Sequence, residues 1–306
     1  MTKADNKIDN LLEDPRFYRW SPAAVLRIFG EDSFAFLQGQ LTNDLRNLER
    51  DRSVYGLWLN HKGRVLADGF VVSSAAPAEF WIVSYFSLGP QIRERLEAFI
   101  VADDVVIEDL SGRWAGVALL GLPGGGFPQT PATRVGFGFV GRRALQPSSE
   151  WVYPVTSENE RAVAAALAGR SELSAVEMEQ LRIAAKIPVV PIDIGPGELP
   201  NEGGLDETAI SYTKGCYLGQ EVMARLKTMG QVRRRLLRVR GNGAIPSLPA
   251  ALYDGERRVG ELRSAVVNAE GFVGLALLTL LHLQPDRALR FSVHAEESAV
   301  RLIDLA

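Results

Sequence analysis

KGCYLGQE, residues 214–221, contains Cys216, the one cysteine among the 306 residues of the chain. It stands where a loop is expected to run into a helix. A neighbouring ammonium and the positive end of a helix both stabilise the thiolate, which is the reactive form of cysteine. Lys214 and the following turn therefore predict a reactive thiol at Cys216, although a single cysteine is more often a small buried apolar residue.

The composition is that of an ordinary globular protein and excludes several classes of site. Hydrophobic residues make up 46% of the chain and charged residues 23%, which is typical of soluble domains. One cysteine excludes an intramolecular disulfide, and three scattered histidines leave no Cys/His cluster for a metal. The net charge of -3 gives no general attraction for nucleic acid, so we expect no stable nucleic-acid binding.

No apolar run is long enough to span a membrane, and the first ten residues lack the apolar core of a secretory signal. We therefore expect a cytoplasmic protein that binds no membrane. The chain also exceeds the size of a usual single core, which predicts two or three packed units.

The first third of the chain alternates helical and strand-like patterns. Residues 31–48 carry apolar residues at helical spacing with a break at Gly39, which predicts two short helices. Residues 54–60 and 65–72 predict a hairpin with Gly63 at the bend. A strand over 80–85, an amphipathic helix over 88–100 and a strand over 105–110 follow.

The remaining two thirds predict a helix, an irregular segment and a barrel. Ser174 and Glu177 are typical of a helix start and favour a helix over 174–185. Residues 187–202 are rich in proline and glycine but too apolar for a linker, so we expect them to line a cavity. Beyond residue 230, short strand-like runs separated by turn signals predict a compact antiparallel barrel. The arginines between 233 and 240 are interpreted as a solvated strand face.

With these elements placed, the chain resembles the YgfZ family of folate-binding proteins. These act in iron–sulfur cluster assembly and repair and are related to the glycine-cleavage T-protein, an aminomethyltransferase. The family hallmark is Lys-Gly-Cys-[Phe/Tyr]-x-Gly-Gln-Glu, and residues 214–221 match it at every fixed position. Supporting matches lie in the same order at residues 36–44, 59–68, 182–188 and 199–202.

The resemblance implies an α+β fold with a T-protein-like, three-domain architecture around a central folate cavity. We expect an N-terminal α+β domain over residues 1–110, completed by about 174–230, and a middle α+β domain over 111–173. The segment 174–230 would line the cavity and place Cys216 at its mouth. An antiparallel β-barrel would occupy residues 231–306.

Departures from the aminomethyltransferases argue against their chemistry. Those enzymes carry an Asp-Asp pair where this chain has Ala67-Asp68, and a basic residue where Gln220 stands. Their equivalent of the octapeptide also lacks the cysteine. The loss of a carboxylate and the gain of a thiol predict that the folate pocket is retained and that the chemistry differs.

The cofactor that the resemblance implies is tetrahydrofolate or a one-carbon derivative, whose site needs a carboxylate, apolar walls and a cation. Asp68 and Glu202 are the candidate carboxylates, although each could instead cap a turn or pair with an arginine. Arg225 and Glu221 share a helix face, as an ion pair or as ligand-binding groups. The other candidate cofactor-binding residues are Asn43, Asn60, Arg64, Gln220 and Tyr217. Tyr217 could either stack on a ring of the ligand or fill the core.

The leading hypothesis is a tetrahydrofolate-binding protein that uses Cys216, with Lys214, in assembling or repairing iron–sulfur clusters. Its partners would be iron–sulfur client or assembly proteins, with a link to tRNA modification. Alanine at either residue is expected to abolish iron–sulfur enzyme activity in cells without unfolding the protein. One alternative is a folate-dependent one-carbon transferase or demethylase with Asp68 as its acid or base. Another is a non-catalytic adaptor that senses folate.

Overall fold

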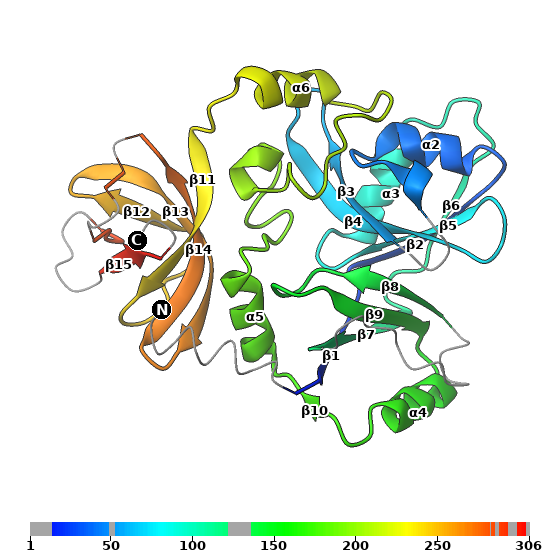
Figure 1. Ribbon diagram of the computed structural model, residues 1–306, viewed down its shortest axis with the longest axis horizontal. Coiled ribbons are helices and arrows are strands. Elements are labelled where there is room, and N and C mark those ends of the chain that lie inside the picture. Colours follow the sequence, from blue (N-terminus) through cyan, green and yellow to red (C-terminus); the bar gives the residue numbers. More distant parts are fainter. Residues whose placement is uncertain are drawn as a thin grey trace.

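The computed structural model describes residues 14–48, 53–121, 136–281, 283–284, 288–292 and 299–303. The N-terminal ten residues and two of the three histidines, His282 and His294, lie outside them. The described residues form three five-stranded sheets. Two of these sheets pack against each other, and the third forms a separate barrel-like unit on the far side of helix α5, Ala175–Ala184 (Figure 1). The predicted α+β fold with a C-terminal antiparallel unit is confirmed.

The first sheet has the strand order β3-β4-β5-β2-β6. Its strands are β2 Ala24–Phe29, β3 Ser53–Leu59, β4 Val65–Ser73, β5 Glu79–Ser84 and β6 Val106–Asp109. The helices α2 Ser33–Gln40 and α3 Gly89–Glu97 bury Leu37 and Ile92 against this sheet. The hairpin β3–β4 turns at Gly63, whose φ of 70° is the left-handed conformation that favours glycine.

One predicted helix in this unit is shorter than expected. The second helix of residues 31–48 is only a 3-10 turn, η2 Leu45–Asn47. The Asp44 side chain accepts a hydrogen bond from the Arg46 backbone N–H at 3.0 Å, a local bond that competes with continued α-helix. The loop between α2 and η2 stays extended for this reason and contacts the segment of the Cys motif.

The second sheet has the order β10-β1-β7-β9-β8. Its strands are β1 Arg16–Trp20, β7 Trp114–Leu120, β8 Phe137–Gly141, β9 Ser148–Pro154 and β10 Ser171–Glu172, and α4 Ser157–Ala166 packs on it. The strand β1 pairs with β7 and β10. The expected boundary at residue 110 assigns β1 to the first unit, whereas Phe17 is buried with Val117 and Trp151 of the second.

Helix α5 and the segment after it connect these two sheets to the barrel. Helix α5 starts at the predicted capping box, in which the Ser174 and Glu177 side chains bond each other's backbone N–H groups. Residues 187–199 are irregular, as predicted, and lead into the 3-10 turn η4 Pro200–Gly203. The Cys motif then precedes helix α6 Gln220–Met229.

The third sheet is the predicted C-terminal antiparallel barrel, with the order β12-β13-β14-β11-β15. Its strands are β11 Arg234–Gly241, β12 Ala250–Asp254, β13 Arg257–Asn268, β14 Gly271–Thr279 and β15 Val300–Leu302. Leu289 and Arg290 form isolated bridges with Val300 and Tyr253 rather than a continuous strand. No helix in the described parts of the chain is long and apolar enough to cross a membrane.

Candidate functional site

A cavity of about 180 Å³ lies where both paired sheets meet the start of helix α5. The sequence prediction named one of its lining residues, Asp68 of β4. Ile187 and Pro188, from the irregular segment predicted to line a cavity, are also part of its wall. The other lining residues that matter for its chemistry are Tyr18, Trp20, Tyr55, Tyr85, Arg142 and Arg143.

Asp68 is a buried carboxylate held by hydroxyl groups. It is 5% exposed, and Oδ2 accepts a hydrogen bond from the Tyr55 hydroxyl at 2.8 Å. Oδ1 accepts from the hydroxyls of Ser87 at 2.7 Å and Ser84 at 3.2 Å. Burial raises the pKa of Asp68, and these hydroxyls together with the charge of Arg142 oppose that rise. Its neighbours therefore satisfy it as an acceptor without supplying a salt bridge.

Two consecutive arginines follow β8 and face the same cavity. The Arg143 guanidinium lies 3.8 Å from the ring centre of Tyr85 and 4.3 Å from that of Trp20, and its Nε donates to Glu150 at 2.9 Å. The Arg142 guanidinium lies 4.4 Å from the ring centre of Tyr55. Stacking on aromatic faces restrains both side chains.

A third lining arginine, Arg182 of α5, is fully engaged in the fold. Its Nη1 donates to Asp193 at 2.9 Å, and its Nε donates to Glu179 at 2.8 Å. Asp193 also accepts a hydrogen bond from the Ser264 hydroxyl of the barrel strand β13. Because its N–H donors are used in these pairs, Arg182 stabilises the wall of the cavity. Through Asp193 and Ser264 it also connects this wall to the barrel.

The Cys motif lies apart from the residues that line this cavity. Cys216 is exposed and free, and it is not a lining residue, so the structure does not support the expected place at the cavity mouth. Lys214 is buried, and its ammonium donates to the backbone carbonyls of Gln38, Leu41 and Asn43 at 2.5, 2.6 and 3.0 Å. Burial lowers the pKa of Lys214 to about 8, while three carbonyl acceptors favour the ammonium. The lysine thus anchors the motif to the loop after α2.

The rest of the motif packs against the β3–β4 turn. Gly219 has a φ of 86°, and a Cβ there would lie 2.8 Å from the carbonyl oxygen of Asn60. The Asn60 side chain accepts from the backbone N–H groups of Lys62 and Arg64 and so holds the turn. Tyr217 is buried in the core beneath. The structure therefore gives Asn60 and Tyr217 packing partners and places neither in the cavity wall.

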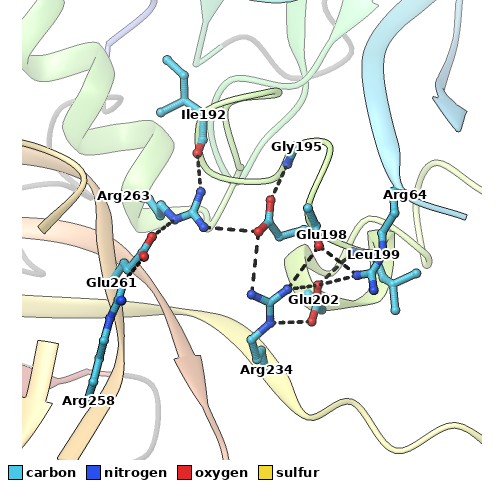
Figure 2. Close-up of polar contacts among 11 residues, drawn as sticks. Arg64, Ile192, Gly195, Glu198, Leu199, Glu202, Arg234, Arg258, Glu261 and Arg263 are labelled. Atoms are coloured by element: carbon cyan, nitrogen blue, oxygen red, sulfur yellow. Dashed lines mark hydrogen bonds and ion pairs between the residues drawn. The ribbon is translucent and has the colours of Figure 1, made fainter. Parts of the chain in front are cut away.

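Glu202 belongs to an ion-pair network between the irregular segment and the barrel (Figure 2). Its carboxylate accepts from Arg234 Nε at 2.9 Å and Nη2 at 3.0 Å, and from the Leu199 backbone N–H at 2.8 Å. Arg64 reaches the same carboxylate at 3.9 Å. Glu202 thus pairs with arginines, which was the alternative to ligand binding. Neither Glu202 nor Arg64 lines the cavity with Asp68.

None of the other candidate cofactor-binding residues is a lining residue of the cavity. Arg225 donates to Glu221 at 2.9 Å on an exposed face of α6, which is the ion-pair alternative. The Asn43 amide donates to the carbonyls of Tyr55 and Thr208. Gln220 is the first residue of α6.

Comparisons with known proteins find similar sequences over most of the chain. A model described as the GCVT N-terminal domain matches residues 18–123, and one described as the CAF17 C-terminal β-barrel domain matches residues 233–304. A "tRNA-modifying protein YgfZ" of Edwardsiella ictaluri is 29% identical over 296 residues, which cover 89% of this chain and 85% of that protein. The protein of the same name from Yersinia pseudotuberculosis is 27% identical over 288 residues, or 87% and 85% of the two chains. Over most of its length the chain is therefore similar to proteins named YgfZ.

The fold of this chain is also that of a solved enzyme. The glycine cleavage system aminomethyltransferase T from Bartonella henselae superimposes with a TM-score of 0.76 at 17% sequence identity. The match covers 98% of the present chain and 88% of the other. At this identity the likeness shows the fold.

The sequence analysis did not predict most of the residues that line the cavity. Tyr55 was part of a predicted strand, and Arg142-Arg143 followed a stretch with no motif. The available signal was the pair of adjacent arginines directly after the strand-ending Gly141. Tyr18 and Trp20 enter the cavity because β1 joins the second sheet, a long-range pairing that no local pattern encodes.

Proposed function

We propose that this protein binds tetrahydrofolate, or a one-carbon derivative, in the cavity at Asp68, and that the Cys216 thiol serves in assembling or repairing iron–sulfur clusters of client enzymes. The observation that carries the proposal is a buried carboxylate between aromatic walls, with guanidinium groups in the same cavity. The likeness to proteins named YgfZ and the fold shared with a glycine cleavage aminomethyltransferase support a folate-related site.

The residues present fit a folate. A pterin is planar and presents N–H groups on one edge, so it needs an acceptor and flat apolar walls. Asp68 offers carboxylate oxygens, and Trp20, Tyr85 and Phe86 offer aromatic surface. Arg142 Nη1 and Arg143 Nη2 are buried and have no hydrogen-bond partner among the described residues. A ligand with both donor and acceptor groups would satisfy this set.

Each residue has a role that follows from its position. Asp68 would bind and orient the N–H edge of the pterin, and the aromatic side chains would exclude water from the ring. Tetrahydrofolate, when bound, supplies a carrier of one-carbon units. Because Tyr55, Ser84 and Ser87 already hold the Asp68 carboxylate in place, little side-chain freedom would be lost on binding.

The thiol would act at a second site. Cys216 is exposed on the segment before α6, where a partner protein can reach it. Among the described residues, no group of three or more His, Cys, Asp or Glu side chains could hold a metal ion. A cluster would therefore be cargo held mainly by the partner, to which Cys216 could give one ligand.

The test separates the two sites. Calorimetry with tetrahydrofolate should give the same Kd for wild type and Cys216→Ser and at least a tenfold weaker one for Asp68→Asn. In cells that lack the wild-type protein, Cys216→Ser should fail to restore iron–sulfur enzyme activity, whereas the exposed neighbour Thr213→Ala should restore it. Full activity of Cys216→Ser would rule out the thiol role, and an unchanged Kd in Asp68→Asn would rule out the folate site.

A further inference from the structure

Not every charged side chain around the cavity forms a salt bridge with an oppositely charged one. Arg182 is paired with Asp193 and Glu179, and Arg143 is paired with Glu150. Arg142 forms no salt bridge with any described residue, although it lines the same cavity as Asp68. Asp68 in turn accepts only from hydroxyls and its own surroundings supply no cation within salt-bridge distance. Burial raises the pKa of Asp68 and the charge of Arg142 lowers it, but no salt bridge joins these two lining residues.

The position of Arg142 is fixed from two sides. Its backbone N–H donates to the Tyr85 hydroxyl at 3.3 Å, and its guanidinium lies over the Tyr55 ring. Its Nη1 is nevertheless buried without a hydrogen-bond acceptor, and so is Nη2 of the adjacent Arg143. Arg143 itself is 6% exposed. Buried guanidinium N–H groups without an acceptor are costly, and a ligand that supplies oxygen atoms removes that cost.

We propose that Arg142, with the Nη2 N–H of Arg143 as a second donor, is the anion subsite of this cavity and binds a carboxylate of the glutamate tail of folate. The assignment rests on the proposed folate binding at Asp68. One unpaired guanidinium matches one carboxylate in charge, and charge-assisted hydrogen bonds to carboxylates are the strongest kind that arginine makes. The charge of Asp68 disfavours a doubly charged phosphate in the same cavity. Because the arginine is already stacked on Tyr55, binding would order few new torsions.

The experiment compares two ligands that differ only in charge. Tetrahydrofolate and its derivative with both glutamate carboxylates converted to amides are titrated calorimetrically, under anaerobic conditions, into wild type, Arg142→Gln, Arg142→Lys and Arg235→Gln. Arg235 is an exposed arginine of the barrel strand β11 and serves as the matched control. Thermal unfolding of each variant is measured alongside.

Wild type and Arg235→Gln are expected to bind the diamide about ten to a hundred times more weakly than tetrahydrofolate, the range for lost charge-assisted hydrogen bonds. Arg142→Gln should lose tetrahydrofolate affinity by the same factor and bind the diamide as wild type does, which also shows that its cavity is folded. Arg142→Lys should keep part of the discrimination.

Several outcomes would overturn the assignment. One is equal affinity of wild type for both ligands, and another is undiminished discrimination in Arg142→Gln. Equal loss of both ligands in Arg142→Gln would also overturn it, because the arginine would then serve the pterin ring or the fold. Each of these leaves folate binding intact. Failure of wild type to bind tetrahydrofolate would instead overturn the proposed function and this assignment with it.

Discussion

Glu202 of the irregular segment and Arg234 of the first barrel strand form a two-pronged ion pair, with N···O distances of 2.9 and 3.0 Å. The carboxylate is buried and also accepts the Leu199 backbone N–H. Nearby, Glu198 accepts from Arg263 of β13 at 3.2 Å (Figure 2). Two barrel strands are therefore connected to the irregular segment, which begins at the cavity wall with Ile187 and Pro188.

Glu202→Gln should loosen this connection. The neutral amide cannot hold Arg234 with two charged hydrogen bonds, and a partly buried guanidinium is left without its counter-ion, so we expect a loss of about 2 kcal/mol in unfolding free energy. Urea denaturation measures it. The control is Arg225→Gln, which breaks the exposed Glu221 pair and should cost less than about 0.5 kcal/mol. Equal losses in both variants would contradict the structural role of Glu202.

The two glycines of the Cys motif should respond differently to alanine. At Gly219 the left-handed φ and the Asn60 carbonyl oxygen both oppose a Cβ, so Gly219→Ala should cost about 2 kcal/mol or more. At Gly215 no atom lies within 4 Å of the Cβ position and φ is not positive. Gly215→Ala should therefore leave the melting temperature nearly unchanged. A comparable destabilisation at both positions would be inconsistent with this geometry.

Features with a local cause could be predicted from the sequence. The turn at Gly63 and the capping box of Ser174 and Glu177 depend on residues close together in the chain, and both are present as predicted. The place of β1 in the second sheet could not be predicted, because Phe17 finds its partner Leu119 about a hundred residues away. Local patterns carry no information on such pairing.

The candidate site shows the same difference between features with a local cause and features set by long-range packing. Asp68 was found because a family motif marks it, and Arg142 was missed because only the packing of two sheets brings it to the same cavity. Glu202 is the opposite case. The motif marked it as a carboxylate for ligand, but its partner was decided by Arg234, 32 residues further on. The sequence thus indicates which chemical groups are present, whereas long-range packing decides which of these groups contact each other.

Lys214→Met should damage the fold as well as any thiol function. The methionine keeps the unbranched apolar part of the side chain but leaves the carbonyls of Gln38, Leu41 and Asn43 without their donor. We expect a loss of about 3 kcal/mol in unfolding free energy and faster hydrogen exchange in the Cys motif. Cys216→Ser, at an exposed position, is the control and should unfold like wild type. The earlier expectation that alanine at Lys214 leaves the fold intact would be supported only by an unchanged stability of Lys214→Met.

Asp68→Asn should change the pH dependence of stability with a defined sign. Burial raises the pKa of Asp68 above its usual 3.8, so the folded state keeps this proton to a higher pH than the unfolded state. In the window from about pH 3.8 up to the folded pKa, the native state binds more protons, and its stability falls as pH rises. Asparagine does not titrate, so it contributes no such pH dependence to the stability. The stability of Asp68→Asn relative to wild type should therefore be greater at pH 7 than at pH 4, as measured by urea denaturation at both values. A difference that is constant with pH, or of opposite sign, would show that the hydroxyl groups and Arg142 outweigh the burial of the carboxylate.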